Sequence, residues 1–436
     1  MPKEIDKMRV VVLGAGFGGL TFCQTLDCPR AHVTLVDRQN HHLFQPLLYQ
    51  VATAGLSAPE IAQPVRSILR NRRNITVLMH DVTGIDMAKK NVQLGSSFLP
   101  YDYLVIALGG VTSYFGHPAW ERHAPGLKTL DDALRIRQRI LLAFERAENS
   151  VEAAERERLM TIVVVGGGAT GAELAGAFAE LSRRVLKRDF RRIDPRQTRV
   201  ILVEAGPRLL PHFPTRLSTN AAARLEKMGV EVRTGHRVAD IGDGILYLAD
   251  GDRIQSANII WAAGVEANPL TRELGVDLDR SGRIRVNPDL SVPGHPEAFA
   301  IGDVALVQDG NGGQVPGVSP AAMQMARHVA RLIHQECGSG NANSDKRPEF
   351  HYRNKGTMAT IGRSAAVAQI GQFAFSGWPA WAAWLLVHLI ELIGFRNKSA
   401  VLLQWTYSYF NYQLGSRIVF GPENSVMSPV LRRNNP

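Results

Sequence analysis

The chain has 436 residues, 45% of them hydrophobic and 21% charged, so it is long enough for more than one core and too apolar to be disordered. Its three cysteines exclude a disulfide framework and make a cysteine-rich metal site implausible, so we expect no metal ion. The net charge of +10 is compatible with nucleic acid, an anionic membrane surface or mere solubility. The N-terminal residues run directly into an apolar strand without an export signal, which predicts a cytoplasmic origin.

A buried strand over residues 9–13 leads into a glycine-rich turn and a helix over residues 20–26. The turn has the GxGxxG pattern and comprises Gly14, Ala15, Gly16, Phe17, Gly18 and Gly19. Its glycines permit a tight turn, let the backbone approach a pyrophosphate, and let the helix pack closely on the strand. Asp37 ends the next strand, where its carboxylate would accept hydrogen bonds from a ribose. The combination predicts a dinucleotide site, whereas a glycine cluster alone would be weak support.

The same pattern returns after a strand over residues 161–165, followed by a helix over 172–181 and a strand over 199–203. Its turn contains Gly166, Gly168, Ala169, Thr170 and Gly171. Glu204 ends the second strand, and its charge favours NADH over NADPH, although the nearby Arg208 weakens that inference. The basic stretch 183–199 nearly lacks aromatic residues, so we expect a solvated helical excursion and no nucleic-acid partner.

A third motif, a strand ending in Gly302 and Asp303, resembles the second FAD motif of the two-dinucleotide-domain flavoprotein disulfide reductase superfamily. The resemblance implies that Asp303 holds the ribityl chain of FAD, which leaves NADH for the second fold. A strand over residues 103–107 leads to Leu108, Gly109 and Gly110, in the place of that superfamily's ATG turn, and Leu108 departs from the usual threonine.

Cys23 and Cys28 have the CxxxxC spacing of a redox-active disulfide. They fall on and after the first helix, at its end remote from the nucleotide, so neither sulfur is expected to reach a flavin. We therefore expect two free thiols. Without cysteines at the flavin, disulfide reduction and persulfide-based sulfide oxidation lose their chemistry.

Four further segments resemble signatures of the type II NADH:quinone oxidoreductases, single-subunit NADH dehydrogenases that do not pump protons. They span residues 41–53, 261–265, 357–363 and 388–398, and the motifs follow in order from about residue 8 to 420. The resemblance implies an α/β fold with two Rossmann-like dinucleotide-binding domains, for FAD and NADH, plus a C-terminal membrane-associating helical unit. The expected ranges are 1–111 with 295–340 for FAD, 112–294 for NADH and 341–436 for the membrane unit.

The resemblance also implies the reaction, in which hydride passes from C4 of NADH to N5 of FAD and two electrons continue to a membrane quinone. Glu173 is the expected residue beside nicotinamide and flavin, with Gln324 on the quinone side. Where the family has AQxxxQ, this chain has Ser319, Pro320 and Gln324, which puts the quinone headgroup preference in doubt. The proton source is left open among Glu173, His42, water on Gln324 and solvent. The remaining expected cofactor-binding residues are Arg38, Gln45, Pro46, Val82, Ala107, Ala322, Ala263 and Gly264.

Residues 378–395 are apolar almost all round but shorter than a membrane span, and His388 and Glu391 interrupt them. We expect an interfacial helix with Trp381, Trp384, His388 and Glu391 on one face. A second amphipathic helix over 399–414 places Val401, Leu402, Trp405, Tyr409 and Tyr412 on one side and Gln404, Ser408 and Asn411 on another.

Arg396, Lys398 and Arg417 flank these helices and would meet anionic headgroups, so a peripheral position on the cytoplasmic face of the membrane is expected. The same aromatic residues would also suit a homodimer interface. Two rival functions remain: a flavin reductase for a small electron-transfer protein, and an NADH-sensing flavoprotein with slow turnover.

Overall fold

The computed structural model describes residues 7–309, 313–339, 347–411 and 416–419. Contacts divide the chain into two compact units, each built around its own mostly parallel sheet. The first comprises Met1–Leu43, Ala62–Ser113 and Val265–Lys355, and the second Phe44–Ile61, Tyr114–Gly264 and Gly356–Pro436. Residues 265–294 thus group with the first unit and residues 356–436 with the second. The three expected domain ranges remain a prediction about which segments hold each nucleotide.

The first unit has a six-stranded sheet in the order β20-β21-β9-β1-β2-β5. Its strands are β20 (Ser291–Val292), β21 (His295–Ala300), β9 (Tyr103–Ile106), β1 (Met8–Leu13), β2 (Ala31–Asp37) and β5 (Ile75–Met79). All neighbours pair in parallel except β20 and β21. The β-branched run of β1 is buried, as expected for a strand covered on both faces. Both strands predicted to flank the first turn are confirmed.

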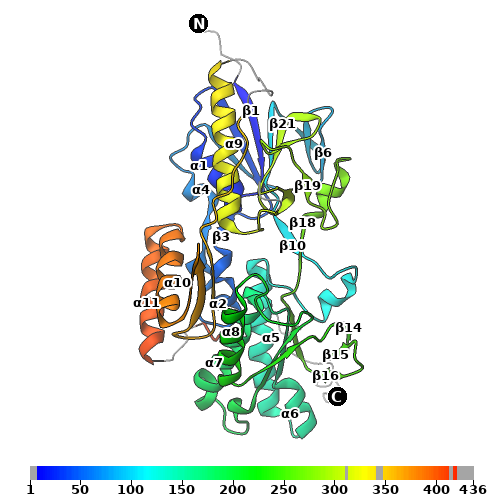
Figure 1. The fold of residues 1–436 in the computed structure, drawn as a ribbon, viewed down its shortest axis with the longest axis vertical. Helices are drawn as coiled ribbons and strands as arrows, with labels where there is room; N and C mark the ends of the chain where they lie inside the picture. Colours follow the sequence, from blue (N-terminus) through cyan, green and yellow to red (C-terminus); the bar gives the residue numbers. More distant parts are fainter. Residues whose placement is uncertain (1–6, 310–312, 340–346, 412–415, 420–436) are drawn as a thin grey trace, which may run out of the picture. The chain divides into compact units, whose positions relative to one another are not determined.

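Helices α1 (Phe17–Thr25) and α9 (Ser319–Ser339) lie against each other beside β1 (Figure 1). The short helix α4 (Val65–Ile68) belongs to the same unit. Smaller sheets complete it, formed by β3 (His41–Leu43) with β4 (Ala62–Pro64), β6 (Gly84–Asp86) with β7 (Asn91–Leu94) and β8 (Ser97–Pro100), β10 (Gly110–Thr112) with β18 (Val265–Ala267), and β19 (Ile284–Arg285) with β22 (Ala305–Leu306).

The second unit has a four-stranded parallel sheet, β13-β12-β11-β17, and an antiparallel sheet, β14-β15-β16. The parallel strands are β13 (Val230–Thr234), β12 (Arg199–Glu204), β11 (Thr161–Val165) and β17 (Asn258–Trp261). The antiparallel strands are β14 (Val238–Gly242), β15 (Ile245–Leu248) and β16 (Arg253–Gln255). The predicted repeat of strand, turn, helix and strand is confirmed.

The helices that precede the C-terminal part of the second unit include α2 (Leu48–Ala52), α5 (Leu130–Asn149), α6 (Ala153–Leu159), α7 (Ala169–Glu180) and α8 (Thr215–Lys227). Shorter helical turns are α3 (Ala58–Ile61), η1 (Gln45–Leu47) and η2 (Pro118–Arg122). The basic stretch after α7 is less regular than the predicted helical excursion. It consists of a π-helical turn, η3 (Leu181–Val185), and two 3₁₀ turns, η4 (Leu186–Arg188) and η5 (Pro195–Gln197). In the first unit, η6 (Pro269–Glu273) and η7 (Gly302–Val304) are also 3₁₀ turns.

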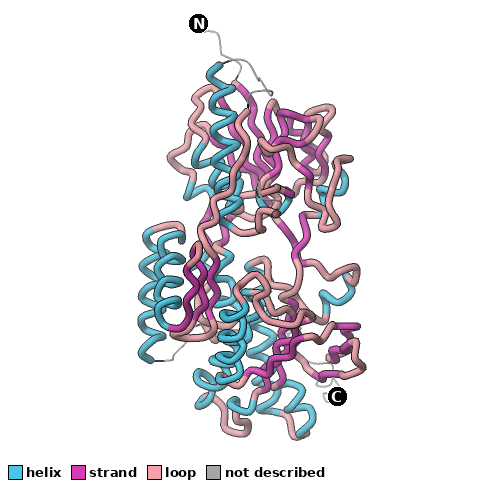
Figure 2. The backbone as a smooth tube through the Cα atoms, viewed as in Figure 1, coloured by secondary structure: helices cyan, strands magenta, loops and turns pink. Residues whose placement is uncertain are grey.

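The C-terminal part of the second unit is a three-stranded antiparallel sheet with two helices beside it (Figure 2). The strands are β23 (Thr357–Thr360), β24 (Ala366–Ile370) and β25 (Phe373–Gly377), and the helices are α10 (Trp378–Glu391) and α11 (Phe395–Asn411). Small buried side chains let α10 pack closely on β24, because Ala366 and Ala368 meet Ala380. The sequence predicted the two helices but not the strands.

The Trp381, Trp384 and His388 side of α10 faces inward, contrary to its predicted interfacial role, whereas Glu391, predicted for the same face, is exposed. Trp384 is 1% exposed and stacks on His388, with ring centroids 4.0 Å apart. The side that faces outward carries instead Leu386, Val387 and Ile390. Among the described residues, no helix is long and apolar enough to cross a membrane. The predicted pattern on the second helix is only partly covered, because the side chains of Ser408, Tyr409, Asn411 and Tyr412 lie outside the described part of the structure.

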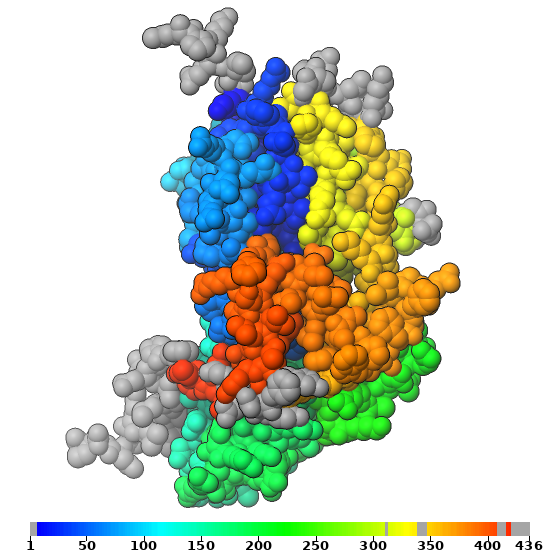
Figure 3. All heavy atoms as spheres, turned by 90° about the vertical axis from the view of Figure 1, so that its left-hand side faces the viewer, coloured from blue at the N-terminus to red at the C-terminus, as the bar shows by residue number. Residues whose placement is uncertain are grey.

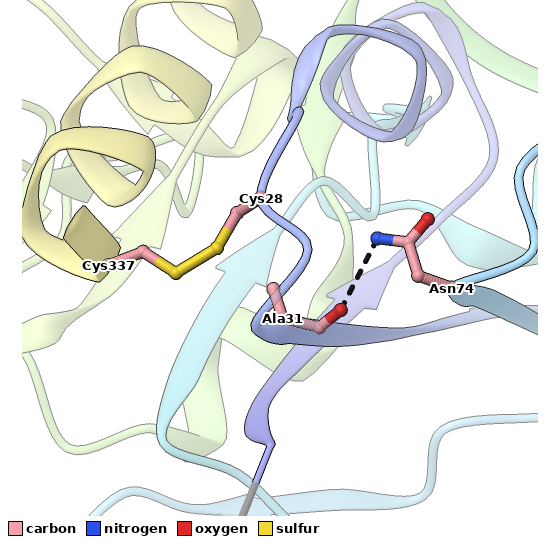
Figure 4. The surroundings of a disulfide bond; sticks show 4 residues. All are labelled: Cys28, Ala31, Asn74 and Cys337. Atoms are coloured by element: carbon pink, nitrogen blue, oxygen red, sulfur yellow. Dashed lines mark hydrogen bonds between the residues drawn. A yellow bond between two sulfur atoms is a disulfide. The ribbon is translucent and has the colours of Figure 1, made fainter. Parts of the chain in front are cut away.

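Cys28 forms a disulfide with Cys337, between the ends of α1 and α9 in the first unit (Figure 4). The prediction that Cys28 is a free thiol is therefore wrong. The CxxxxC spacing indicates only a local pair, whereas the true partner is 309 residues away and is brought close by helix packing. Cys23 is free and buried, as predicted, and burial raises the pKa of its thiol to about 12. The Asn74 amide donates to the Ala31 carbonyl at 3.3 Å and fixes the loop after Cys28.

This pairing predicts that one thiol per unfolded chain reacts with a thiol reagent before reduction, and all three cysteines afterwards. Cys28→Ser should lower the free energy of unfolding by about 2–4 kcal/mol, because the cross-link restricts the unfolded chain. Cys23→Ser, which touches no disulfide, is the matched control. Two or three reactive thiols before reduction would contradict the pairing.

Candidate functional site

The first glycine turn has a backbone that side chains would block. Gly14 has φ +100°, and a Cβ there would lie 2.3 Å from the carbonyl oxygen of Ala107. A Cβ on Gly19 would lie 1.8 Å from the oxygen of Gly14, so the helix packs on the turn only with glycine there. A Cβ on Gly16 would meet nothing within 4 Å, which leaves open space where a phosphate would approach.

Asp37 holds the first turn in place through backbone hydrogen bonds. One carboxylate oxygen accepts from Ala15 N at 2.6 Å and the other from Gln39 N at 2.7 Å. A carboxylate has further lone pairs, so Asp37 can still accept from a ribose hydroxyl. Gly16 caps α1 without a side-chain hydrogen bond, so the first-turn N–H groups remain available for an anion.

The carboxyl ends of five parallel strands gather most of the predicted FAD residues at one edge of the first unit's sheet. Gly14 to Gly19 follow β1. Asp37 is the last residue of β2, and Arg38 comes directly after it. Val82 follows β5, Ala107 follows β9, and Gly302 and Asp303 follow β21. Gly302 has φ +74°, and a Cβ there would lie 3.3 Å from the Cβ of Ala322. The Asp303 carboxylate lies beside two glycines, because a Cβ on Gly110 or Gly317 would come within 3.2 Å of it.

His42 gives this edge an unpartnered polar atom. Its side chain is 3% exposed, and Nδ1 lies 2.9 Å from the carbonyl oxygen of Ala15 in the glycine turn. Nδ1 therefore carries the hydrogen, which leaves Nε2 as an acceptor without a partner among the described residues. Burial lowers the pKa of the imidazole. A glycine cradle, a helix N-terminus without a side-chain cap and this orphan acceptor together fit a bound dinucleotide cofactor.

The second turn reproduces the geometry of the first. Gly166 has φ +110°, and a Cβ on Gly171 would lie 1.8 Å from the Gly166 oxygen. Glu204 takes the part of Asp37 and accepts from Gly167 N at 2.5 Å and Gly206 N at 2.6 Å. Gly168 faces open space and caps α7 without a side-chain bond. Ala169 and Thr170 begin α7, and Ala263 and Gly264 follow β17 at the same edge.

Arg208 is held away from a ligand role. Its guanidinium donates to the carbonyl oxygens of Phe213 at 2.8 Å and Pro211 at 2.7 Å, and to the Ser218 hydroxyl at 3.2 Å. These contacts occupy the cation that would otherwise pair with a 2′-phosphate. The inference that Arg208 weakens the preference for NADH therefore loses its basis.

A cavity of about 630 Å³ lies wholly within the second unit. Aromatic and aliphatic side chains of α10 and α11 form one wall, among them Trp381, Trp384, Leu389 and Trp405. The rest of the lining includes polar groups, namely Tyr49, Gln50, Glu173, Glu180, Arg184, Thr360 and Arg363. A mostly apolar cavity with a few convergent polar groups is typical of a site for a small hydrophobic ligand.

Glu173 lies on α7, two residues after Gly171 of the second glycine turn, and lines this cavity. Its Oε1 accepts from the backbone N–H of Thr360 at 3.2 Å. The side chain is only partly accessible, through the cavity, and burial raises the pKa of its carboxyl to about 8 although the Thr360 donors oppose the shift. Burial therefore favours the protonated form of the Glu173 carboxyl.

Two other ionisable groups at or near the cavity are also shifted. Burial raises the pKa of Glu180, which accepts from Arg363 N at 2.6 Å. Burial lowers the pKa of His388 to about 4, and its Nδ1 lies 2.7 Å from the Trp384 carbonyl oxygen. His388 is thus neutral, with its hydrogen on Nδ1.

Not all predicted site residues meet at one place. Ser319, Pro320 and Gln324 begin α9 in the first unit, whereas residues of the second unit line the cavity. Both amide atoms of Gln324 bond to the backbone of Arg353, at 3.0 Å each. Gln45 and Pro46 form η1 in the second unit, where the Gln45 amide donates to the Lys128 carbonyl at 3.2 Å.

Comparison with known proteins decides the family. The pyridine nucleotide-disulphide oxidoreductase family matches residues 8–327, and the NDH2 C-terminal domain family matches residues 354–411. The type II NADH:quinone oxidoreductase Ndh of Mycobacterium tuberculosis is 46% identical over 419 residues, which cover 93% of this chain and 89% of that relative. The chain belongs to the type II NADH:quinone oxidoreductases.

Other members of this family agree with the assignment. The type II NADH:quinone oxidoreductase of Haemophilus influenzae is 30% identical over 393 residues, covering 83% of this chain and 87% of the relative. NDH2 from Plasmodium falciparum, solved in complex with NADH, superimposes with a TM-score of 0.86 at 21% identity, covering 95% of this chain and all of that one. At that identity the likeness shows the fold alone. The predicted family and the predicted α/β fold are both confirmed.

Sequence reasoning missed the polar residues that surround Glu173 in the type II fold. Gln50 and Thr360 stood within segments that carried the family resemblance, but no role was attached to them. Likewise, the sequence predicted no contact of Tyr49 or Trp405 with the site. Only the packing of α2 and β23 against α7, together with the hydrogen bond from Trp405 of α11 to Gln50, reveals these neighbours.

Proposed function

We propose that this chain is an NADH:quinone oxidoreductase that carries FAD, oxidises NADH and reduces a quinone in the cavity of the second unit. The observation that carries the proposal is a mostly apolar cavity lined by a carboxyl, Glu173, whose pKa burial raises. A quinone is an apolar molecule whose reduction consumes protons, so it requires both features.

The residues at the edge of the first sheet would hold FAD. Gly14, Gly16 and the uncapped N-terminus of α1 suit the pyrophosphate, Asp37 the adenosine ribose and Asp303 the ribityl chain. When bound, FAD accepts hydride from NADH and passes the two electrons on to the quinone.

The second turn would hold NADH in the same manner. The first-turn N–H groups of α7 would bind the pyrophosphate, and Glu204 would accept from the adenosine ribose. The Glu204 charge repels a 2′-phosphate, and Arg208 is occupied by backbone carbonyls, so NADH is favoured over NADPH.

Glu204→Gln should therefore narrow the preference for NADH over NADPH by about tenfold, since one unfavourable charge contact is removed. Its turn contacts also weaken, so a modest rise in the KM for NADH is expected. Steady-state kinetics with both nucleotides measure the ratio, and Glu231→Gln on the neighbouring strand β13 is the matched control. A wild-type enzyme that uses both nucleotides equally would contradict this role of Glu204.

The proton balance gives Glu173 its role. Overall, NADH, one proton and a quinone yield NAD⁺ and a quinol, so the quinol needs one proton more than NADH supplies. In the proposed step the O–H bond of Glu173 breaks and an O–H bond to a quinone oxygen forms. The electron pair stays on the carboxylate, which solvent then reprotonates.

The outward side of α10 and α11 supplies the proposed membrane contact. This surface, named here the apolar face, is turned toward the viewer in Figure 3, where α10 and α11 are orange to red. It comprises Leu386, Val387, Ile390, Phe395, Leu402, Leu403 and Tyr407. Arg396 and Lys398 lie beside it and would meet anionic lipid headgroups. We place the enzyme peripherally on the cytoplasmic face of the membrane, with a homodimer through the same face as the alternative.

The rival functions account less well for these features. A reductase of a small electron-transfer protein needs neither an apolar cavity nor an apolar face. An NADH sensor needs no protonated carboxyl at a cavity. The test is turnover of NADH by the FAD-loaded protein with and without a soluble benzoquinone. Quinone-dependent turnover supports the proposal, whereas slow NADH oxidation that quinone does not accelerate would exclude it.

A further inference from the structure

Four side chains from three segments form a hydrogen-bonded chain that ends on Glu173. Trp405 Nε1 on α11 donates to Gln50 Oε1 at 2.8 Å, and Gln50 Nε2 donates to the Tyr49 hydroxyl at 3.1 Å. The Tyr49 hydroxyl lies 3.0 Å from Thr360 Oγ1. Thr360 Oγ1 in turn lies 3.5 Å from Glu173 Oε1, at the long end of hydrogen-bonding distance.

The indole at the far end gives this chain one direction. An indole N–H can only donate, so the Gln50 oxygen must face Trp405 and the Gln50 NH₂ must face Tyr49. The Tyr49 oxygen accepts that hydrogen bond, which leaves its own hydrogen for Thr360. The Thr360 hydroxyl is then free to donate to Glu173.

The direction decides which oxygen of Glu173 carries the proton. Oε1 receives the backbone N–H of Thr360 at 3.2 Å as well as the Thr360 hydroxyl. An oxygen that accepts two donors serves as the carbonyl oxygen of a neutral acid, so the acidic hydrogen resides on Oε2. No described side chain donates to Oε2, and Glu173 lines the cavity.

We propose that Trp405, Gln50, Tyr49 and Thr360 are positioning residues that keep the Glu173 proton on Oε2, presented to a quinone in the cavity. This inference rests on the proposed function and adds residues to it. Thr360 acts on Glu173 directly, and the other three act through Thr360. Because Trp405 belongs to α11, the chain also links the helix of the apolar face to the proton donor.

The groups around Glu173 determine how its proton responds to pH. Tyr49 on α2, Glu180 on α7, Arg184 after α7 and Arg363 after β23 share the cavity, whereas α10 and α11 line it with apolar or uncharged side chains. Glu180 accepts from Arg363 N, which opposes the rise in the Glu180 pKa. The Thr360 donors hold down the pKa of Glu173, so their loss should raise it further.

The decisive comparison is Thr360→Val with Thr360→Ser in the FAD-loaded enzyme, using reoxidation by a short-chain benzoquinone followed across pH. Quinone reduction should fall as pH rises past about 8, where Glu173 loses its proton. Thr360→Val should slow the reaction about tenfold. It should also raise the pH at which the rate falls, here called the alkaline limb of the pH profile, by roughly half a pH unit. Thr360→Ser, which keeps the hydroxyl, should restore both the rate and the limb.

Tyr49→Phe and Trp405→Phe test the rest of the chain and guard against a folding defect at Thr360. Both should move the limb in the same direction, and Trp405→Phe by the smaller amount. FAD content and thermal stability are compared for every variant. Thr219→Val, on α8 with its hydroxyl bonded to the Thr215 carbonyl, is the control for loss of a threonine hydroxyl.

The outcomes separate this inference from the proposed function. If Glu173→Gln leaves quinone reduction intact, Glu173 is not the proton donor. That result contradicts the proposed function of Glu173, and the positioning chain with it. If Glu173→Gln abolishes quinone reduction but Thr360→Val keeps the wild-type limb, only the positioning chain is overturned. A shifted limb in Thr360→Val that Thr360→Ser reverses supports the chain.

Discussion

Glu173→Gln is expected to slow quinone reduction by about two to three orders of magnitude while NADH still reduces the bound flavin at close to the wild-type rate. The amide cannot release a proton, whereas the neutral carboxyl it replaces can. The substitution keeps the size and the acceptor oxygen of the side chain, so the contact with Thr360 N at 3.2 Å is retained. Stopped-flow absorbance of the flavin follows the two half-reactions separately.

Glu226→Gln is the matched control, because Glu226 is exposed on α8 and undergoes the same substitution away from the cavity. An equal loss in both half-reactions of Glu173→Gln would place Glu173 in NADH binding rather than proton delivery. Full quinone reduction in this variant would transfer the role to another donor, such as His42 or solvent.

The double variant Ile390→Glu with Leu403→Glu is expected to bind membranes about 100-fold more weakly. The two side chains are 60% and 70% exposed and do not line the cavity, so the cavity should survive. Withdrawing each from lipid costs about 1.5 kcal/mol or more, and 1.4 kcal/mol corresponds to a factor of ten. Vesicle flotation measures binding, and turnover is compared for lipid-embedded and water-soluble quinones.

Phe98→Glu with Val151→Glu is the control, because both side chains are exposed apart from α10 and α11. Only the embedded quinone should become a poorer substrate for the Ile390 and Leu403 variant. If this variant stays on vesicles but sediments as a monomer where the wild type is a dimer, the apolar face is a dimer interface instead. High salt alone should release the wild type only partly, since screening weakens the basic contacts but not the apolar ones.

The nucleotide folds were predictable because their signals are local. The strand, glycine turn, helix and terminal acid at Gly14 to Asp37 and at Gly166 to Glu204 follow one another along the chain. The pattern already implies why glycine is required. A Cβ on Gly19 or Gly171, for example, would lie 1.8 Å from a carbonyl oxygen of the same turn. Even the acid-to-turn hydrogen bonds repeat, from Ala15 to Asp37 and from Gly167 to Glu204.

The surroundings of Glu173 were not predictable, because their contacts are distant in sequence. Gln50 and Trp405 are 355 positions apart, and Tyr49 and Thr360 are 311 apart. Periodicity identified α10 but not which of its sides faces inward, since nearly every position is apolar. The β23 to β25 sheet, which covers one side of α10, decides that orientation. The disulfide between Cys28 and Cys337 was not predicted for the same reason, because the two residues are 309 positions apart.

The central claim is that NADH oxidation by this chain is coupled to quinone reduction through the cavity of the second unit. Anaerobic titration tests it most directly: the FAD-loaded protein on quinone-containing vesicles receives NADH, and NAD⁺ and quinol are counted. We predict that one quinol forms for each NADH oxidised. The Glu173→Gln variant should lose this turnover, and neither oxygen nor excess NADH should restore it. NADH oxidation that proceeds without quinol formation, or that requires oxygen, would contradict the account.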